Sequence, residues 1–119
     1  GEVILVLGGA GGGMIPPAVV HAVTRVIDFG IDLPQALSEP RVAGGPGGVF
    51  NAETSPGIGW TDIEIAEMEA LGLDINKQPR TGAFGRIHGI QFDPETRTLI
   101  GAADPDWEGT ARGPMTNRR

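Results

Sequence analysis

The chain has 119 residues, enough for one ordinary domain, and carries a formal net charge of −6 with a pI of about 4.7. An acidic chain without a basic stripe is unsuited to nucleic acid or to an anionic membrane surface, so we expect neither as a partner. Cysteine is absent, which excludes disulfides, thiolate catalysis and cysteine-ligated zinc. No apolar run approaches the roughly 18 residues of a membrane span.

An unbroken apolar run, Val3–Leu7, predicts the first β-strand. A strand that is apolar at every position is typically buried on both faces, with neighbouring strands beside it. Gly1 and Glu2 are typical of the end of a turn. We therefore expect a preceding strand outside this chain, and we expect the chain to be part of a larger protein.

The next six residues, Gly8–Gly13, predict a glycine-rich loop that leads into a helix. This order gathers backbone N–H groups at the positive end of the helix. Pro16 and Pro17 suit a first helical turn and have no N–H. Donors aimed at a negatively charged oxygen must therefore come from Gly11, Gly12, Gly13 or Met14. A tight connection that binds no ligand is the alternative interpretation.

The segment from Ile15 to Phe29 predicts an amphipathic helix that ends at Gly30. We expect His21, Arg25 and Asp28 to lie on its polar face, with His21 in a solvated surface position rather than a catalytic one. Asp32 predicts the N-cap of a short helix that ends near Pro40. The apolar residues at helical spacing in the first helix are Ile15, Val19, Ala22, Val23 and Val26.

Further elements follow in the second half of the chain. A loop is expected at Gly44–Gly48 and a strand at Val49–Glu53. Thr61 and Glu64 form a capping box that predicts a helix ended by Gly72. Its apolar stripe is expected to contain Ile65, Met68 and Leu71, and a short strand is expected at Leu73–Lys77.

The last elements predict a β-hairpin. Arg86–Phe92 alternates in hydropathy, Asp93–Thr96 predicts a turn, and Thr98–Ala102 returns as the partner strand. We expect His88 to be buried or at a sheet edge. From Asp104 on we expect a loop and a tail, to which Arg112, Arg118 and Arg119 give a small positive bias.

Taken in order, five segments of the chain resemble the C-terminal part of the small subunit of gamma-glutamyltransferases, which are N-terminal nucleophile hydrolases. The resemblance implies an α+β fold that is part of an αββα sandwich. It covers residues 1–105 and leaves 106–119 as a loop and C-terminal tail. The segments are Leu5–Ile15, Val26–Gly30 with Ala36 and Pro40–Arg41, Glu69–Gly72, Gln91–Thr96, and Leu99–Pro105.

The resemblance also implies roles for the glycine segment. The family pattern there is Gly-Ser-Pro-Gly-Gly-Ser-Arg, which Gly8, Gly11 and Gly12 match. The paired glycines supply the oxyanion hole in the family, so Gly11 and Gly12 inherit that role. Gly9, Ala10 and Gly13 depart from the pattern and are the candidates for substrate contacts.

In the family, autocleavage exposes a threonine whose α-amino group acts as its base. This chain begins with Gly1, and the family nucleophile lies upstream of the region covered. The expected partners are the large subunit, the rest of the small subunit, and a γ-glutamyl or related acyl-amide substrate such as glutathione. Alone, the chain is expected to be inactive. No cofactor or metal is implied, and the compartment stays open, although family members are often periplasmic, secreted or surface-bound.

Two departures bear on the substrate. Phe84–His88 replaces a small-residue segment of the family, and Asp106–Gly109 lacks the usual arginine after Asp-Pro. These differences leave open another acyl group, as in the related cephalosporin acylases. Two alternatives are a nucleotide-binding module, disfavoured because no Lys followed by Ser or Thr ends the loop, and a non-catalytic remnant or isolated structural domain.

Overall fold

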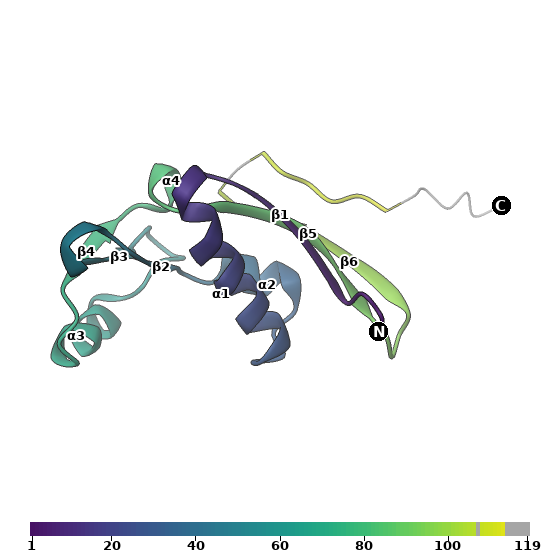
Figure 1. Ribbon diagram of the computed structural model, residues 1–119, viewed down its shortest axis with the longest axis horizontal. Helices are drawn as coiled ribbons and strands as arrows, with labels where there is room; N and C mark the ends of the chain where they lie inside the picture. The colour runs from purple at the N-terminus through teal and green to yellow at the C-terminus, as the bar shows by residue number, and fades with distance from the viewer. Residues whose placement is uncertain (107, 114–119) are drawn as a thin grey trace.

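The computed structural model describes residues 1–106 and 108–113 and contains two small β-sheets (Figure 1). The first sheet has the order β1-β5-β6, with β1 at Leu5–Ala10, β5 at Arg86–Asp93 and β6 at Thr98–Ala103. Both pairings in it are antiparallel. The helices α1 (Ile15–Ile27) and α2 (Leu33–Ser38) cover one face of this sheet (Figure 1).

The second sheet has the order β2-β3-β4, formed by Val42–Gly44, Phe50–Glu53 and Ile75–Gln78. The strands β2 and β3 are antiparallel, whereas β3 and β4 are parallel. Parallel neighbours need a crossover, and α3 (Asp62–Ala70) lies within it. The short elements are η1 (Gly12–Met14), η2 (Pro46–Gly48) and α4 (Arg80–Ala83).

The main core lies between the first sheet and the two helices that cover it. Ala18 and Ala22 are buried on α1, and their small side chains let the helix approach the sheet closely. Leu33 and Leu37 of α2 are both 0% exposed. Burial of each leucine contributes about 1.5–3 kcal/mol. The other buried members of this core are Val26, Ala36, Ile87 and Ala102.

Several local predictions are confirmed. The β5–β6 hairpin pairs antiparallel, and Pro16 and Pro17 lie in the first turn of α1. The side chain of Asp32 accepts a hydrogen bond from the backbone N–H of Gln35 at 3.0 Å. Both halves of the Thr61–Glu64 capping box are present. Each of these features is set by residues close together in sequence, which is why the pattern predicts them.

The glycine loop is shorter than predicted. The strand β1 continues through Gly8, Gly9 and Ala10, which pair with residues of β5, so the turn begins only at Gly11. A Cβ added to Gly8 would lie 2.8 Å from Nε2 of His88, so glycine at this position gives the imidazole room. These three residues pair with residues of β5, which is far away in the sequence. The glycine content of the segment does not reveal this pairing.

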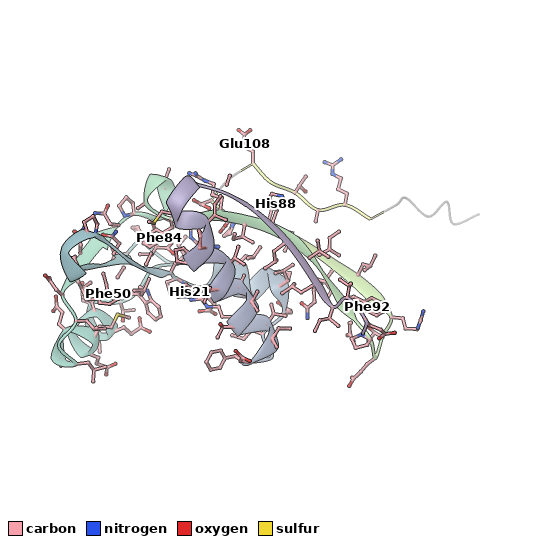
Figure 2. All side chains as sticks on the ribbon, in the orientation of Figure 1. His21, Phe50, Phe84, His88, Phe92 and Glu108 are labelled. Carbon is pink, nitrogen blue, oxygen red and sulfur yellow. The ribbon has the colours of Figure 1, made fainter. Side chains whose placement is uncertain are left out.

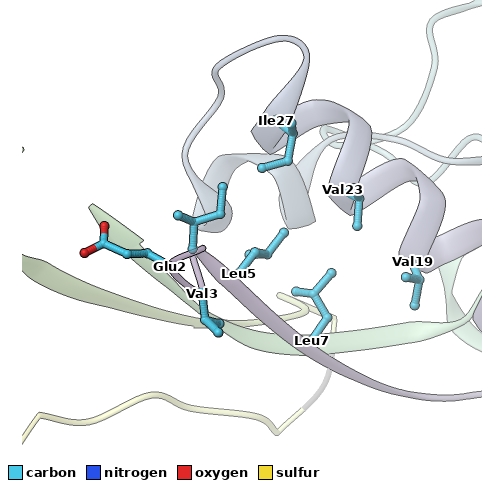
Figure 3. Close-up of a pocket in the computed structure, with 8 residues that line it drawn as sticks. Glu2, Val3, Leu5, Leu7, Val19, Val23 and Ile27 are labelled. Atoms are coloured by element: carbon cyan, nitrogen blue, oxygen red, sulfur yellow. The ribbon is translucent and has the colours of Figure 1, made fainter. Parts of the chain in front are cut away.

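In the described part of the chain the first strand is not buried on both faces. Its burial was predicted together with a neighbouring strand outside this chain, and it stays a prediction. Val3, Ile4 and Val6 are 70%, 41% and 58% exposed. The strand β1 is an edge strand, and helices cover only one face of its sheet. The outer face also exposes Ile90 and Leu99. Figure 3 shows an apolar groove between the start of the chain and α1, lined by Leu5, Leu7, Val19, Val23 and Ile27, together with Glu2, Val3 and Ile4.

Two short elements and one residue of α3 also differ from the predictions. The strand β2 and the helix α4 were not predicted, because segments of three or four residues show no readable periodicity. Leu71 lies at the C-cap of α3 and is 83% exposed, so it does not belong to the buried stripe. Arg118 and Arg119 of the predicted tail lie outside the described residues. Within those residues no helix has the length and apolar character needed to cross a membrane.

The predicted solvent position of His21 is also wrong, since its side chain is only partly exposed. The side chain of Arg25, on the same face of the helix, is partly exposed too. Nε2 of His21 lies 2.7 Å from the carbonyl oxygen of Val42. Arg25 donates to the carbonyl oxygens of Ala36 and Glu39 at 3.2 Å each, and also to Pro40. The polar face of α1 therefore packs against β2 and the carboxyl end of α2, where its side chains bind backbone carbonyls.

This burial predicts a pH effect. Desolvation by burial is the main reason that the pKa of His21 lies below its ordinary value of 6.5; the hydrogen bond to Val42 opposes the shift, and Arg25 and Arg41 reinforce it. The unfolded chain therefore binds a proton first, so stability falls as the pH drops below about 6.5. We expect His21→Gln, whose amide can still donate to Val42, to weaken this loss. The thermal midpoints of wild type and variant at about pH 7.5 and 5.5 measure it. Equal losses in both proteins would contradict the expectation.

Candidate functional site

The chain leaves β1 and enters α1 through a tight turn at Gly11 and Gly12. Their φ angles are +129° and +57°, a region that L side chains rarely adopt and glycine adopts readily. The carbonyl oxygen of Gly11 accepts from the N–H of Met14 at 3.1 Å, and that of Gly12 accepts from the N–H of Ile15. The carbonyl oxygens of Gly11 and Gly12 therefore hold the turn in shape through hydrogen bonds, and the N–H groups before α1 take no part in those bonds.

The amides of Gly11, Gly12 and Gly13 have no hydrogen-bond partner within residues 1–106 and 108–113. All three residues are exposed. A Cβ added to Gly12 or Gly13 would meet no atom within 4 Å, so the space beside them is open. Unused N–H groups at the amino end of a helix form an anion-binding arrangement, because the helix dipole is positive there. The geometry can therefore stabilise an oxygen that carries negative charge.

The three candidates for substrate contacts, Gly9, Ala10 and Gly13, lie in different surroundings. Gly13 lies in the same turn as Gly11 and Gly12. Gly9 lies in β1 facing the helix, where an added Cβ would be 2.9 Å from Cδ1 of Ile87 and 3.1 Å from Cγ2 of Ile15. Ala10 is exposed at the end of the same strand. The side of Gly9 that would carry a side chain is thus enclosed, whereas Ala10 and Gly13 are open to solvent.

Sequence reasoning missed a cluster of four buried charged residues. Nη2 of Arg41 lies 2.9 Å from both carboxylate oxygens of Asp104. Nε of Arg80 lies 2.9 Å from Oε1 of Glu53, and Nη1 of Arg80 lies 3.6 Å from Oδ1 of Asp104. No side chain of the four is more than 2% exposed. Buried charges persist only when paired, so the two arginines and two carboxylates form one balanced network.

The prediction that His88 is buried or at a sheet edge is wrong. His88 lies in β5, the central strand of its sheet, and its imidazole is exposed on the outer face, away from α1 (Figure 2). The strand β5 pairs with β1 on one side and with β6 on the other, and the helices cover the face of the sheet opposite to the one that carries His88. Within the described part of the chain, no group of three or more His, Asp or Glu side chains is placed to hold a metal ion.

Comparison with known proteins gives consistent matches. A family model described as Gamma-glutamyltranspeptidase matches residues 1–113. The Glutathione hydrolase proenzyme of Bacillus subtilis is 25% identical over 116 residues, which are 98% of this chain and 19% of that protein. The gamma-glutamyltranspeptidase of Pseudomonas nitroreducens, solved as a complex with L-DON, superposes with a TM-score of 0.77 at 26% identity, over 95% of this chain and 56% of that one.

A cephalosporin acylase from Bacillus halodurans is also similar, with a TM-score of 0.71 at 30% identity over 87% of this chain and 20% of that chain. The mixed α/β fold is therefore the fold of the corresponding part of these enzymes. The chain spans about a fifth of the length of the curated relative and about half of the transpeptidase chain.

Proposed function

The chain belongs to the gamma-glutamyltranspeptidase family, and on this premise we propose that it supplies the oxyanion-stabilising part of an active site. The reaction is cleavage or transfer of a γ-glutamyl or related acyl group from an amide such as glutathione. The observation that carries the proposal is the set of unpartnered amides at Gly11 and Gly12, before the first turn of α1.

In the proposed reaction a nucleophile from another segment attacks the amide carbonyl, and the carbonyl oxygen becomes negatively charged. The N–H groups of Gly11 and Gly12 donate hydrogen bonds to that oxygen, and the dipole of α1 adds to the stabilisation. When the tetrahedral intermediate collapses, the C–N bond breaks, the amine leaves with the proton that the nucleophile gave up during its attack, and the acyl group stays on the nucleophile. Water or an amino acid then accepts the acyl group. Ala10 and Gly13, which are open to solvent, are the candidates for contacts with the acyl group.

We place the chain in the C-terminal part of the small subunit, within an αββα sandwich. The exposed apolar residues Val6, Ile90 and Leu99 on the outer face of the first sheet support this placement, because a second sheet would bury them. The large subunit and the rest of the small subunit are then the partners, and the nucleophile comes from the latter. The chain alone is inactive under this proposal.

The experiment compares two chromogenic amides with the complete protein that contains this chain. One is γ-glutamyl-p-nitroanilide, and the other is glutaryl-p-nitroanilide, which differs only by lacking the α-amino group. We expect p-nitroaniline release from at least one of them, and the preferred amide identifies the acyl class. The 119-residue chain alone is the control and should release none. An autocleaved complete protein that is inactive on both amides, and on glutathione, would favour a non-catalytic remnant.

A further inference from the structure

We propose that Arg41 and Asp104 are positioning residues that fix the Gly11–Gly12 turn through the backbone of residues 84–87. This inference rests on the proposed function, because it concerns the same amides. Both side chains are only 2% exposed, whereas Gly11 and Gly12 are exposed. The pair binds the backbone of residues 84–87, and the turn packs against this backbone. The structure shows both sets of contacts.

The pair holds the backbone just before β5 from two sides. Nη1 of Arg41 donates to the carbonyl oxygen of Gly85 at 2.5 Å. Oδ2 of Asp104 accepts from the N–H of Ile87 at 2.6 Å. Arg41 and Asp104 also bind each other, so the ion pair as a whole is hydrogen-bonded to both ends of the Gly85–Ile87 segment. Hydrogen bonds that involve charged groups are the stronger kind, and these are buried from water.

The Gly85–Ile87 segment, which the ion pair binds, packs directly against the Gly11–Gly12 turn. A Cβ added to Gly11 would lie 3.0 Å from Cα of Gly85. A Cβ added to Gly85 would lie 2.4 Å from the carbonyl oxygen of Met14 and 3.0 Å from Cβ of Ala18. Gly85 is buried and fills the gap between Gly11 and the start of α1. Its position therefore sets where the turn and the first turn of the helix can lie.

The hydrogen bonds of the turn itself are made by the carbonyls of Gly11 and Gly12, which accept from the N–H groups of Met14 and Ile15. Gly11 and Gly12 are glycines at positive φ, and their amides have no partner among the described residues. Donors in an oxyanion hole act only if they are held in place before the charge develops. Contact with a fixed Gly85 supplies that restraint. An arginine suits the task because its planar fork binds the carboxylate and the Gly85 carbonyl together, which a lysine ammonium cannot reproduce.

The test is Arg41→Lys in the complete protein, with Arg25→Lys as the matched control. Arg25 also uses its fork to bind backbone carbonyls, but only those of Ala36, Glu39 and Pro40, near the carboxyl end of α2. For the p-nitroanilide that the wild type cleaves, we expect Arg41→Lys to lower kcat by at least about 10-fold with KM within about threefold. We expect Arg25→Lys to leave kcat within about twofold, both variants being assayed well below their thermal midpoints.

A second readout does not depend on activity. With selective ¹⁵N-glycine labelling, Arg41→Lys should shift the amide resonances of Gly11 and Gly12, whereas Arg25→Lys should leave them in place. Unchanged resonances together with an unchanged kcat would overturn the positioning role. Equal kcat losses in both variants would overturn it too, because the effect would then follow general destabilisation. Shifted resonances with a normal kcat would instead count against the oxyanion role of the turn, and so against the proposed function.

Discussion

Gly11→Ala is expected to lower the turnover number of the complete protein by about 100-fold or more, the usual effect of losing one oxyanion-hole donor. Gly11 has a φ of +129°, which alanine does not adopt without strain, and its new Cβ would lie 3.0 Å from Cα of Gly85. The chain relieves both problems by rotating the adjoining peptide, which moves the N–H away from the reacting oxygen. KM should change little, since the interaction is made mainly in the transition state.

Gly57→Ala is the matched control for this variant. Gly57 also has a positive φ, +80°, but it lies in the loop between β3 and α3, outside the proposed site. It should therefore carry a comparable backbone strain and retain most of the activity. The kinetic measurement is normalised to the fraction of autocleaved protein on a denaturing gel, so that slow maturation is not mistaken for slow turnover. A folded, fully cleaved Gly11→Ala protein with wild-type turnover would remove the turn from the mechanism.

The local parts of the fold were readable from sequence because their causes are local. The capping box at Thr61, the Asp32 cap and the β5–β6 hairpin each depend on residues within a few positions of one another. The glycine turn was found for the same reason. Its exact start was missed, because Gly8 and Gly9 are made into strand by pairing with β5, about 80 residues later in the chain.

The charged network was missed for a related reason. Arg41 and Asp104 are 63 positions apart, and each alone resembles an ordinary surface charge. His21 and Arg25 also follow the pattern of a solvated helix face, but that face meets β2 and the carboxyl end of α2. Polarity predicts solvent only where nothing polar packs against the helix. Both errors therefore concern tertiary contacts that helical periodicity cannot report.

Asp104→Asn is expected to cost about 3–5 kcal/mol of stability in the complete protein, the usual effect of breaking a buried ion pair on one side. Arg41 and Arg80 would then share a single carboxylate, that of Glu53, in a site where no side chain is more than 2% exposed. The midpoint of urea unfolding measures the loss. The control is Asp62→Asn, which breaks the exposed ion pair with Lys77 and should leave the midpoint unchanged. Equal midpoints for Asp104→Asn and wild type would contradict the expectation.

Replacing both members of the pair separates stability from positioning. Buried ion pairs are often no more stabilising than apolar side chains of similar size, so Arg41→Met combined with Asp104→Leu should recover much of the stability that Asp104→Asn loses. The same double variant removes the donor to the Gly85 carbonyl and the acceptor for the Ile87 N–H. We therefore expect it to stay folded and to keep the low kcat of Arg41→Lys. A double variant with restored turnover would show that the pair contributes only to stability.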